Sequence, residues 1–303
     1  MTGVVWAVVA GVGFGVFQAF NRRAGRSIDG YLSTFLLLLV SAILLAIVSL
    51  LTEDLGLLRE APLMAYVHFG LAGFVHFFLG WTFLTLSQQR VGAARTGALI
   101  GTTPLFAFAV GLLFFGEVLS LPVVVGVLLV MAGVYLVSRG GPKAQAPPGS
   151  GDAETLDVTW RNSLFGLGTA ICFALSAIFI RHGLEGLPSP LLGVTSGMIL
   201  TTAAYGVLLV LRRKQVRQGP ISRDAWLFQV AAGAFVGLAT WVRWIALDMA
   251  PVAVVLALGR TNVPVVIFLA PLLVGRQAER VTVRVWLGAG LIVAGAVVLN
   301  LYA

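Results

Sequence analysis

The chain has 303 residues, of which 59% are hydrophobic and only 11% are charged, and its mean hydropathy is +0.99. A soluble domain is about half apolar and about a quarter charged, so this composition excludes a soluble protein and predicts an integral membrane protein. The net charge of +8 comes mostly from basic residues in short loops between apolar segments. Membrane topology explains such residues, so we expect no nucleic-acid partner.

Ten apolar segments are long enough to cross the hydrocarbon core, which takes about 20 helical residues. Their internal glycines and prolines favour helices over the short alternating strands of a barrel. The first segment has no basic residue before it and a basic cluster after it, so we expect a retained span rather than a signal peptide. The expected fold is all-α, with ten transmembrane helices near residues 2–20, 31–51, 65–87, 91–115, 120–138, 163–181, 191–211, 226–247, 251–274 and 281–302.

The first span carries polar residues on one face. Gln18 and Asn21 follow Gly11 and Phe14 at spacings of three and four residues. Polar side chains within a bilayer seek partners inside the bundle. Two interpretations stay open, because Gln18 and Asn21 either line a cavity or form hydrogen bonds between helices.

The third span contains His76 and Trp81. A histidine at mid-span suits a proton relay, but a lone histidine is more often a hydrogen-bonded interior residue, and both readings stay open. Trp81 and Trp241 lie deeper in their spans than the other tryptophans and can wall a pocket. We expect the interfacial aromatic belt to contain the tryptophans at positions 6, 160, 226 and 286.

Pro104 and Pro264 fall inside the fourth and ninth spans. A proline within a helix frees the carbonyl four residues earlier, which belongs to Ile100 in the first case and to Arg260 in the second. Free carbonyls at membrane depth are tolerated only where they face protein or water. We therefore expect either a cavity between the fourth and ninth spans or two simple kinks.

Residues 139–162 form the only long polar segment, rich in Gly, Pro and Ala, and this composition predicts a flexible linker. The linker separates five spans in residues 1–138 from five in residues 163–303.

The sixth span carries a stripe of small residues. Ser176 shares this stripe with Thr169 and Cys172, and it either lines a cavity or forms a hydrogen bond to a neighbouring helix. Cys172 is the one cysteine of the chain, so no intrachain disulfide can form, and we interpret it as a small apolar residue that fills space between helices.

The ninth span contains the stretch LALGRTNVPVVIF, which places Arg260 and Asn262 near the middle of the bilayer. An arginine at a helix centre costs about 2.5 to 3.5 kcal/mol, a cost usually offset by a partner or by water. The acids Glu117, Glu279 and Asp248 all fall near span ends. We therefore expect Arg260 to bind an anionic group of a substrate in a water-accessible cavity. The alternative is that it bonds free carbonyls and locks two helices together.

Two further arginines, Arg95 and Arg243, lie about one turn from the ends of their spans. Long basic side chains at such positions reach the headgroups, so we expect both to snorkel to the membrane surface.

The two halves of the chain are related by an internal repeat. An offset of 160 residues brings Trp81 onto Trp241 and Pro104 onto Pro264, and GEVLSLPVVVG at 116–126 parallels AERVTVRVWLG at 278–288. Five spans is an odd number, so the second copy must enter the bilayer from the opposite side. Inverted repeats of this kind are the architecture of secondary transporters, whose substrate site lies near the midplane.

Residues 90–137 resemble the EamA-type branch of the drug/metabolite transporter superfamily, with a small-residue helix, a mid-helix proline, a Gly-Glu pair and a Gly-rich helix. Residues 250–299 are similar, although Gly275 to Glu279 form a small insertion where Gly-Glu would stand. The resemblance covers essentially the whole chain. It implies a ten-helix transporter of small metabolites that works by alternating access.

The sequence contains no metal-ligand spacing, phosphate-binding loop or catalytic triad pattern, so we expect neither an enzyme nor a cofactor nor an ATP-driven pump. The predicted function is secondary transport of a small polar metabolite, with an anionic one favoured by Arg260. The alternative is a non-transporting membrane sensor or assembly protein. Expected partners are the metabolite and the lipid bilayer, and a homodimer stays open.

We expect a multi-pass protein of the plasma (cell inner) membrane. Lys and Arg are concentrated in the odd-numbered loops, which the positive-inside rule places in the cytoplasm, with both termini outside.

Overall fold

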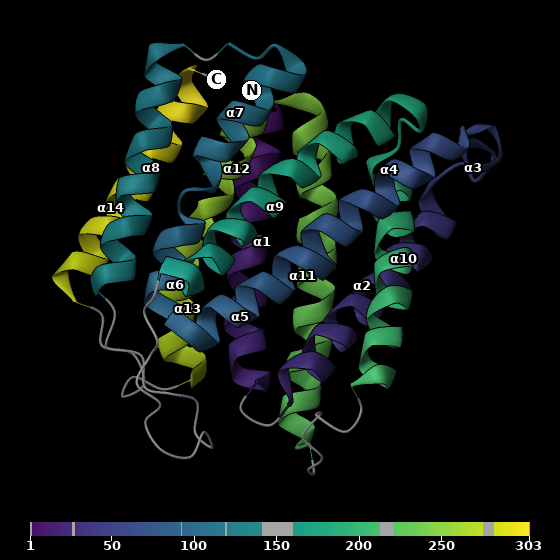
Figure 1. Cartoon of the computed structure of the whole chain (residues 1–303), viewed down its shortest axis with the longest axis horizontal. Helices are drawn as coiled ribbons and strands as arrows, with labels where there is room; N and C mark the ends of the chain where they lie inside the picture. The colour runs from purple at the N-terminus through teal and green to yellow at the C-terminus, as the bar shows by residue number, and fades with distance from the viewer. Residues whose placement is uncertain are drawn as a thin grey trace.

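The computed structural model describes residues 2–25, 28–91, 93–118, 120–140, 160–212, 221–274 and 282–302. Throughout these residues the regular structure is helical (Figure 1). Ten segments are long and apolar enough to cross a membrane, which confirms the expected all-α fold with ten spans. Residues 141–159 of the expected linker, Glu279 and the side chain of Arg95 lie outside the description.

The spans follow the chain in order, and several are divided into shorter helices. The elements are α1 (Thr2–Ala24), α2 (Gly30–Thr52), α3 (Gly56–Glu60), α4 (Leu63–Gly73), η1 (Phe74–Gly80), α5 (Trp81–Val91), α6 (Ala93–Ile100), α7 (Thr103–Phe115), α8 (Leu121–Gly140), α9 (Trp160–Gly186), α10 (Pro190–Leu211), α11 (Arg223–Met249), α12 (Val252–Leu258), η2 (Gly259–Thr261), α13 (Asn262–Val274) and α14 (Val283–Tyr302).

The fourth and ninth spans are broken where the sequence has its repeat-related prolines. Pro104 lies in the first turn of α7 and Pro264 in the first turn of α13. The N–H groups of a first turn have no partner within their own helix, so a proline at this position costs no helical hydrogen bond. The freed carbonyl of Ile100 accepts a hydrogen bond from Thr103 Oγ1 at 2.6 Å. The α-helix is therefore interrupted in both spans, by turn residues 101–102 in the fourth and by the 3-10 helix η2 in the ninth, and a neighbouring hydroxyl satisfies the freed carbonyl of the fourth.

The third span changes its winding in the middle. Between α4 and α5, residues Phe74–Gly80 form the π-helix η1, which carries His76. Widened turns of this kind are rare and are frequent at functional sites. The sequence FVHFFLG contains no proline, and its one glycine, Gly80, is the last residue of the π-helix.

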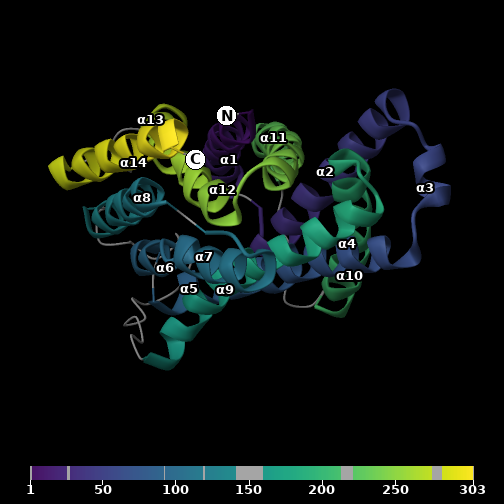
Figure 2. The ribbon, with the colours of Figure 1, turned by 90° about the horizontal axis from the view of Figure 1, so that it is seen from above.

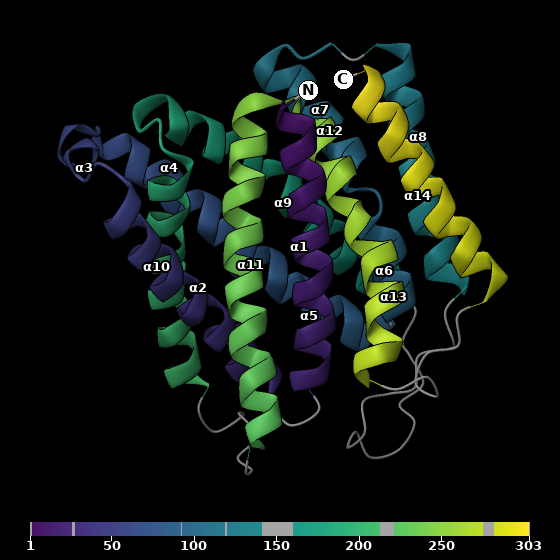
Figure 3. The same cartoon turned by 180° about the vertical axis from the view of Figure 1, so that it is seen from behind.

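Glycines bring the helices into close contact, as is common in membrane bundles. The clearest case is the pair α8 and α14, the last spans of the two halves, which lie side by side in Figures 1 and 3. A Cβ added to Gly288 would lie 2.6 Å from the carbonyl oxygen of Gly133, and one added to Gly133 would lie 2.5 Å from that of Gly288. A third glycine, Gly11 of α1, meets Thr261 of η2 in the same way.

Both termini lie at one end of the bundle, as an even number of spans requires (Figure 1). Seen from above, α1, α9, α11 and α12 occupy the middle, between α8, α13 and α14 on one side and α2, α4 and α10 on the other (Figure 2). Two residues of the candidate site lie on these middle helices, Ser176 on α9 and Arg243 on α11, and the others lie on η1, α7, η2 and α13.

Candidate functional site

The two helix breaks meet through Arg260. Its guanidinium Nη2 donates a hydrogen bond to Thr103 Oγ1 at 2.7 Å, so η2 of the ninth span contacts the start of α7 in the fourth. The Nε atom of Arg260 is buried without a hydrogen-bond partner. The side chain of Asn262 is also buried, and its Oδ1 has no partner. The fourth and ninth spans thus meet at this contact, which contains an unsatisfied donor and an unsatisfied acceptor.

A second polar group lies where the third, sixth and eighth spans meet. Nη1 of Arg243 lies 3.2 Å from His76 Nε2, and His76 Nδ1 lies 3.1 Å from Ser176 Oγ. Ser176 in turn donates to the carbonyl oxygen of Phe173 at 2.9 Å. The chain of hydrogen bonds therefore runs from α11 through η1 to α9.

The direction of these bonds defines the state of the histidine. A guanidinium can only donate, so His76 Nε2 must be the acceptor and the ring must be neutral. The proton is then on Nδ1, which donates to Ser176. His76 is therefore neutral and hydrogen-bonded to both Arg243 and Ser176 in this structure.

Aromatic rings enclose this group. The ring of Phe173 stacks on His76 with centroids 4.4 Å apart, and the guanidinium carbon of Arg243 lies 5.5 Å from the ring centroid of Phe14. Gly11, one turn before Phe14 on α1, contacts Thr261, the residue next to Arg260. The two polar groups thus adjoin the same part of α1, and the like charges of Arg243 and Arg260 repel each other.

The expectation that Arg243 snorkels to the headgroups is wrong. Only 7% of its surface is exposed, and its guanidinium is held inside the bundle by His76 and Phe14. The reason is helix length, because α11 has 27 residues and extends past both expected ends of the span. Arg243 consequently lies farther from the end of its helix than the predicted span indicated.

The remaining predicted residues are spread over the bundle. Asn21 accepts a hydrogen bond from Ser33 Oγ, which also donates to Gln229, so Asn21 joins helices near the end of α1. Gln18 is exposed. Trp81 stacks on Phe17 with centroids 6.2 Å apart.

Trp241 is partly buried and packs on the main core. The structure thus brings together Arg260, Asn262, Pro104 and Pro264 at the breaks, with His76 and Ser176 beside them. It places Asn21 in a separate network. The tryptophans at positions 6, 160, 226 and 286 are exposed, as the aromatic belt requires.

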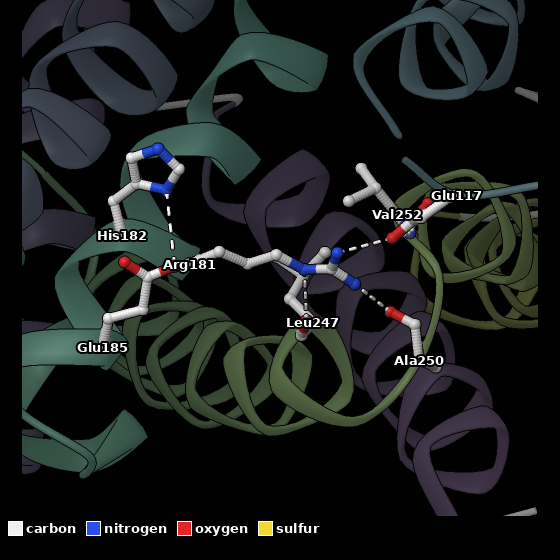
Figure 4. Close-up of polar contacts among 7 residues, drawn as sticks. All are labelled: Glu117, Arg181, His182, Glu185, Leu247, Ala250 and Val252. Carbon is white, nitrogen blue, oxygen red and sulfur yellow. Dashed lines mark hydrogen bonds and ion pairs between the residues drawn. The ribbon is translucent and has the colours of Figure 1, made fainter. Parts of the chain in front are cut away.

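A third arginine, Arg181 of α9, was not singled out from the sequence and forms the cluster shown in Figure 4. Its three guanidinium nitrogens donate to Glu117 and to the carbonyl oxygens of Leu247 and Ala250. Glu117 also accepts from the backbone N–H of Val252 at 3.0 Å. The sequence feature that could have predicted this cluster is Glu117, because an acidic residue at the end of one span favours a basic partner at the end of another.

This cluster ties the end of α7 to α9 and to the connection between α11 and α12. A cavity of about 490 Å³ lies beside it, lined by Phe115, Arg181, Leu184, Glu185, Asp248, Met249, Ala250 and Pro251. Arg260 is not among the lining residues. Beside the cluster, His182 and Glu185 face each other at 3.9 Å (Figure 4).

Comparison with known proteins follows the same two halves. The model of the EamA-like transporter family matches residues 1–139 and 160–301. A solved structure titled only "Crystal structure of protein" covers 99% of this chain and 96% of its own, with a TM-score of 0.76 and 20% identity. At that identity the likeness is one of fold alone. No curated protein matches the chain.

Proposed function

We propose that this chain, which belongs to the EamA-like transporter family, is a secondary transporter that moves a small, polar, anionic metabolite by alternating access. The observation that carries the proposal is Arg260, a guanidinium at a helix break in the bundle interior that has no carboxylate partner among the described residues. The proposal concerns the substrate and the mechanism, which family membership alone leaves open.

Electrostatics supports an anionic substrate. An arginine at the centre of a span costs about 2.5 to 3.5 kcal/mol on insertion scales, and a partner usually offsets this cost. Arg181 has such a partner in Glu117. Among the described residues, no ion pair includes Arg260. A carboxylate or phosphate that arrives with the substrate would supply the missing charge.

The helix breaks support a site near the midplane. Discontinuous helices in inverted-repeat transporters expose unpaired backbone groups and helix ends to substrates. Here the breaks at Pro104 and Pro264 occupy corresponding positions in the two repeats and meet through Arg260 and Thr103. Each break also permits one half of its span to move against the other.

The Arg181 cluster supports alternating access. It connects α7, α9 and the start of α12 at the end of the bundle that holds both termini. When the cluster is formed, this end is held together. Opening toward this side would require Arg181 and Glu117 to separate.

The proposal is tested by binding and uptake of small carboxylates with Arg260 variants reconstituted in liposomes. We expect Arg260→Gln to insert and remain thermally stable while anion uptake falls at least tenfold, and Arg260→Lys to lose less because it keeps the charge. Arg59→Gln, on the exposed helix α3, is the control and should behave as the wild type.

Two results would oppose this function. If either Arg260 variant transports anions normally, or if the loss of uptake follows a matching loss of folded protein, Arg260 is a structural residue that joins two helices.

A further inference from the structure

We propose that Arg243 is a second anion-binding residue of the transport site, and that Arg243 and Arg260 together select a substrate with two negative charges. The chemical class is a small dicarboxylate or a phosphate monoester. This inference rests on the proposed function and narrows its substrate.

One edge of the Arg243 guanidinium has no hydrogen-bond partners. Its Nη1 is used by His76, whereas Nε and Nη2 are both buried and have no hydrogen-bond partner. Nε and Nη2 lie on the same side of a guanidinium and donate in parallel, which is the geometry that binds two oxygens of one carboxylate or phosphate. The unsatisfied atoms of Arg243 are therefore those of one bidentate fork.

The surroundings fix this fork in place. His76 accepts from Nη1 and is itself held by Ser176 and by stacking on Phe173. The ring of Phe14 lies beside the guanidinium. Because Arg243 is 93% buried, bulk water does not solvate the free edge. A buried donor without an acceptor from the protein is costly, so the site favours an acceptor supplied by a ligand.

Arg181 shows how the same fold satisfies an arginine with a structural role. All three of its nitrogens donate to acceptors of the protein, one of them a carboxylate. Arg243 has one of three nitrogens satisfied, and its acceptor is a neutral imidazole. The contrast argues against a purely structural role for Arg243.

The charges of the two arginines favour a doubly charged substrate. Arg243 and Arg260 both adjoin the same part of α1, because Phe14 lies beside the Arg243 guanidinium and Gly11 contacts Thr261, the residue next to Arg260. Within the described part of the chain neither arginine takes part in an ion pair. Glu117, one of the acids near the span ends, is bound by Arg181. A monoanion would neutralise only one of the two guanidinium groups, whereas a dianion neutralises both.

The test compares three labelled probes in proteoliposomes: succinate, glycerol 3-phosphate and the monocarboxylate butyrate. Thermal stabilisation of the detergent-solubilised protein by each probe gives a second readout that does not depend on flux. For the wild type we expect at least one dianion to bind tenfold or more tightly than butyrate. Arg243→Gln should lose that preference, with dianion affinity falling at least tenfold and butyrate affinity changing little.

Arg243→Lys keeps the charge but lacks the fork, so it should lie between the wild type and Arg243→Gln, and it serves if the Gln variant does not fold. Arg59→Gln is again the control. Equal affinities for butyrate and both dianions in the wild type, or equal losses for all probes in Arg243→Gln, overturn the inference while leaving monoanion transport through Arg260 intact. Absence of binding and uptake for every anion overturns the proposed function as well.

Discussion

At the scale of single residues, three arginines in the interior of the bundle are accommodated in three ways. Arg181 is bound by a carboxylate and two carbonyl groups, Arg260 by one hydroxyl, and Arg243 by one imidazole. Arg181 has no unsatisfied nitrogen, Arg260 has one and Arg243 has two. Arg243 therefore has the most donors left for an acceptor supplied by a ligand.

His76 provides a prediction at this scale. His76→Phe keeps an aromatic ring for stacking on Phe173 but removes the acceptor for Arg243, and a hydrogen bond to a charged group contributes about 1.5 to 3 kcal/mol. We expect anion affinity, measured by competition for uptake, to fall roughly tenfold or more on that basis. His76→Gln retains an acceptor and should lose less. A proton-relay role would instead make both variants lose proton-driven uptake equally while affinity is unchanged.

At the scale of elements, the contact between α8 and α14 gives a matched pair of variants. A Cβ at Gly288 would meet the backbone of Gly133, whereas one at Gly290 on the same helix meets nothing within 4 Å. Gly288→Ala should lower the stability of the protein by about 1 to 3 kcal/mol because the helices must separate. Gly290→Ala should be neutral or stabilising. Thermal unfolding in detergent measures both, and equal stabilities would contradict the close packing of these helices.

The break between α6 and α7 gives a second prediction. Thr103 Oγ1 donates to the carbonyl of Ile100 and accepts from Arg260. Thr103→Val keeps the shape but leaves both groups without their partner, so we expect a loss of about 1 to 3 kcal/mol in the free energy of unfolding. Thr103→Ser retains the hydroxyl and should be nearly as stable as the wild type. A Val variant as stable as the Ser variant would show that the hydroxyl does not support the break.

Some features of these elements could be predicted from the sequence, and others could not. Helix length and hydrophobicity located all ten spans, and Pro104 and Pro264 marked both breaks, because these signals are local. The π-helix η1 has no local signal, and the depth of Arg243 depended on the true length of α11. The partners of Arg243 and Arg181 come from distant spans, so only the packing of the bundle could reveal them.

At the scale of the whole molecule, the two ends of the bundle are held differently. Arg181 and Glu117 form a mostly buried pair at the end with the termini, whereas Arg23 and Asp224 at the other end are 33% and 53% exposed. Exposed ion pairs contribute little to stability, while removing one partner of a buried pair costs more. In the conformation described, breaking the Arg181–Glu117 pair should therefore cost more than breaking the Arg23–Asp224 pair.

Separating Arg181 from Glu117 should open that end. In a Cys172→Ala background, we expect Glu117→Gln to increase labelling of a cysteine introduced at Ala250, which is 7% exposed, by a membrane-impermeant maleimide. A cysteine introduced at the exposed Asp248 should be labelled equally with and without Glu117→Gln. Unchanged labelling at position 250 in a folded variant would show that the cluster does not close this end.

The most direct test of the central claim is uptake of labelled succinate and glycerol 3-phosphate by proteoliposomes that contain no nucleotide. The account predicts saturable uptake of at least one of these anions down its imposed gradient, well above protein-free vesicles, and uptake near the protein-free level for Arg260→Gln. Uptake that requires ATP, uptake no greater than in protein-free vesicles, or equal uptake by wild type and Arg260→Gln would contradict it.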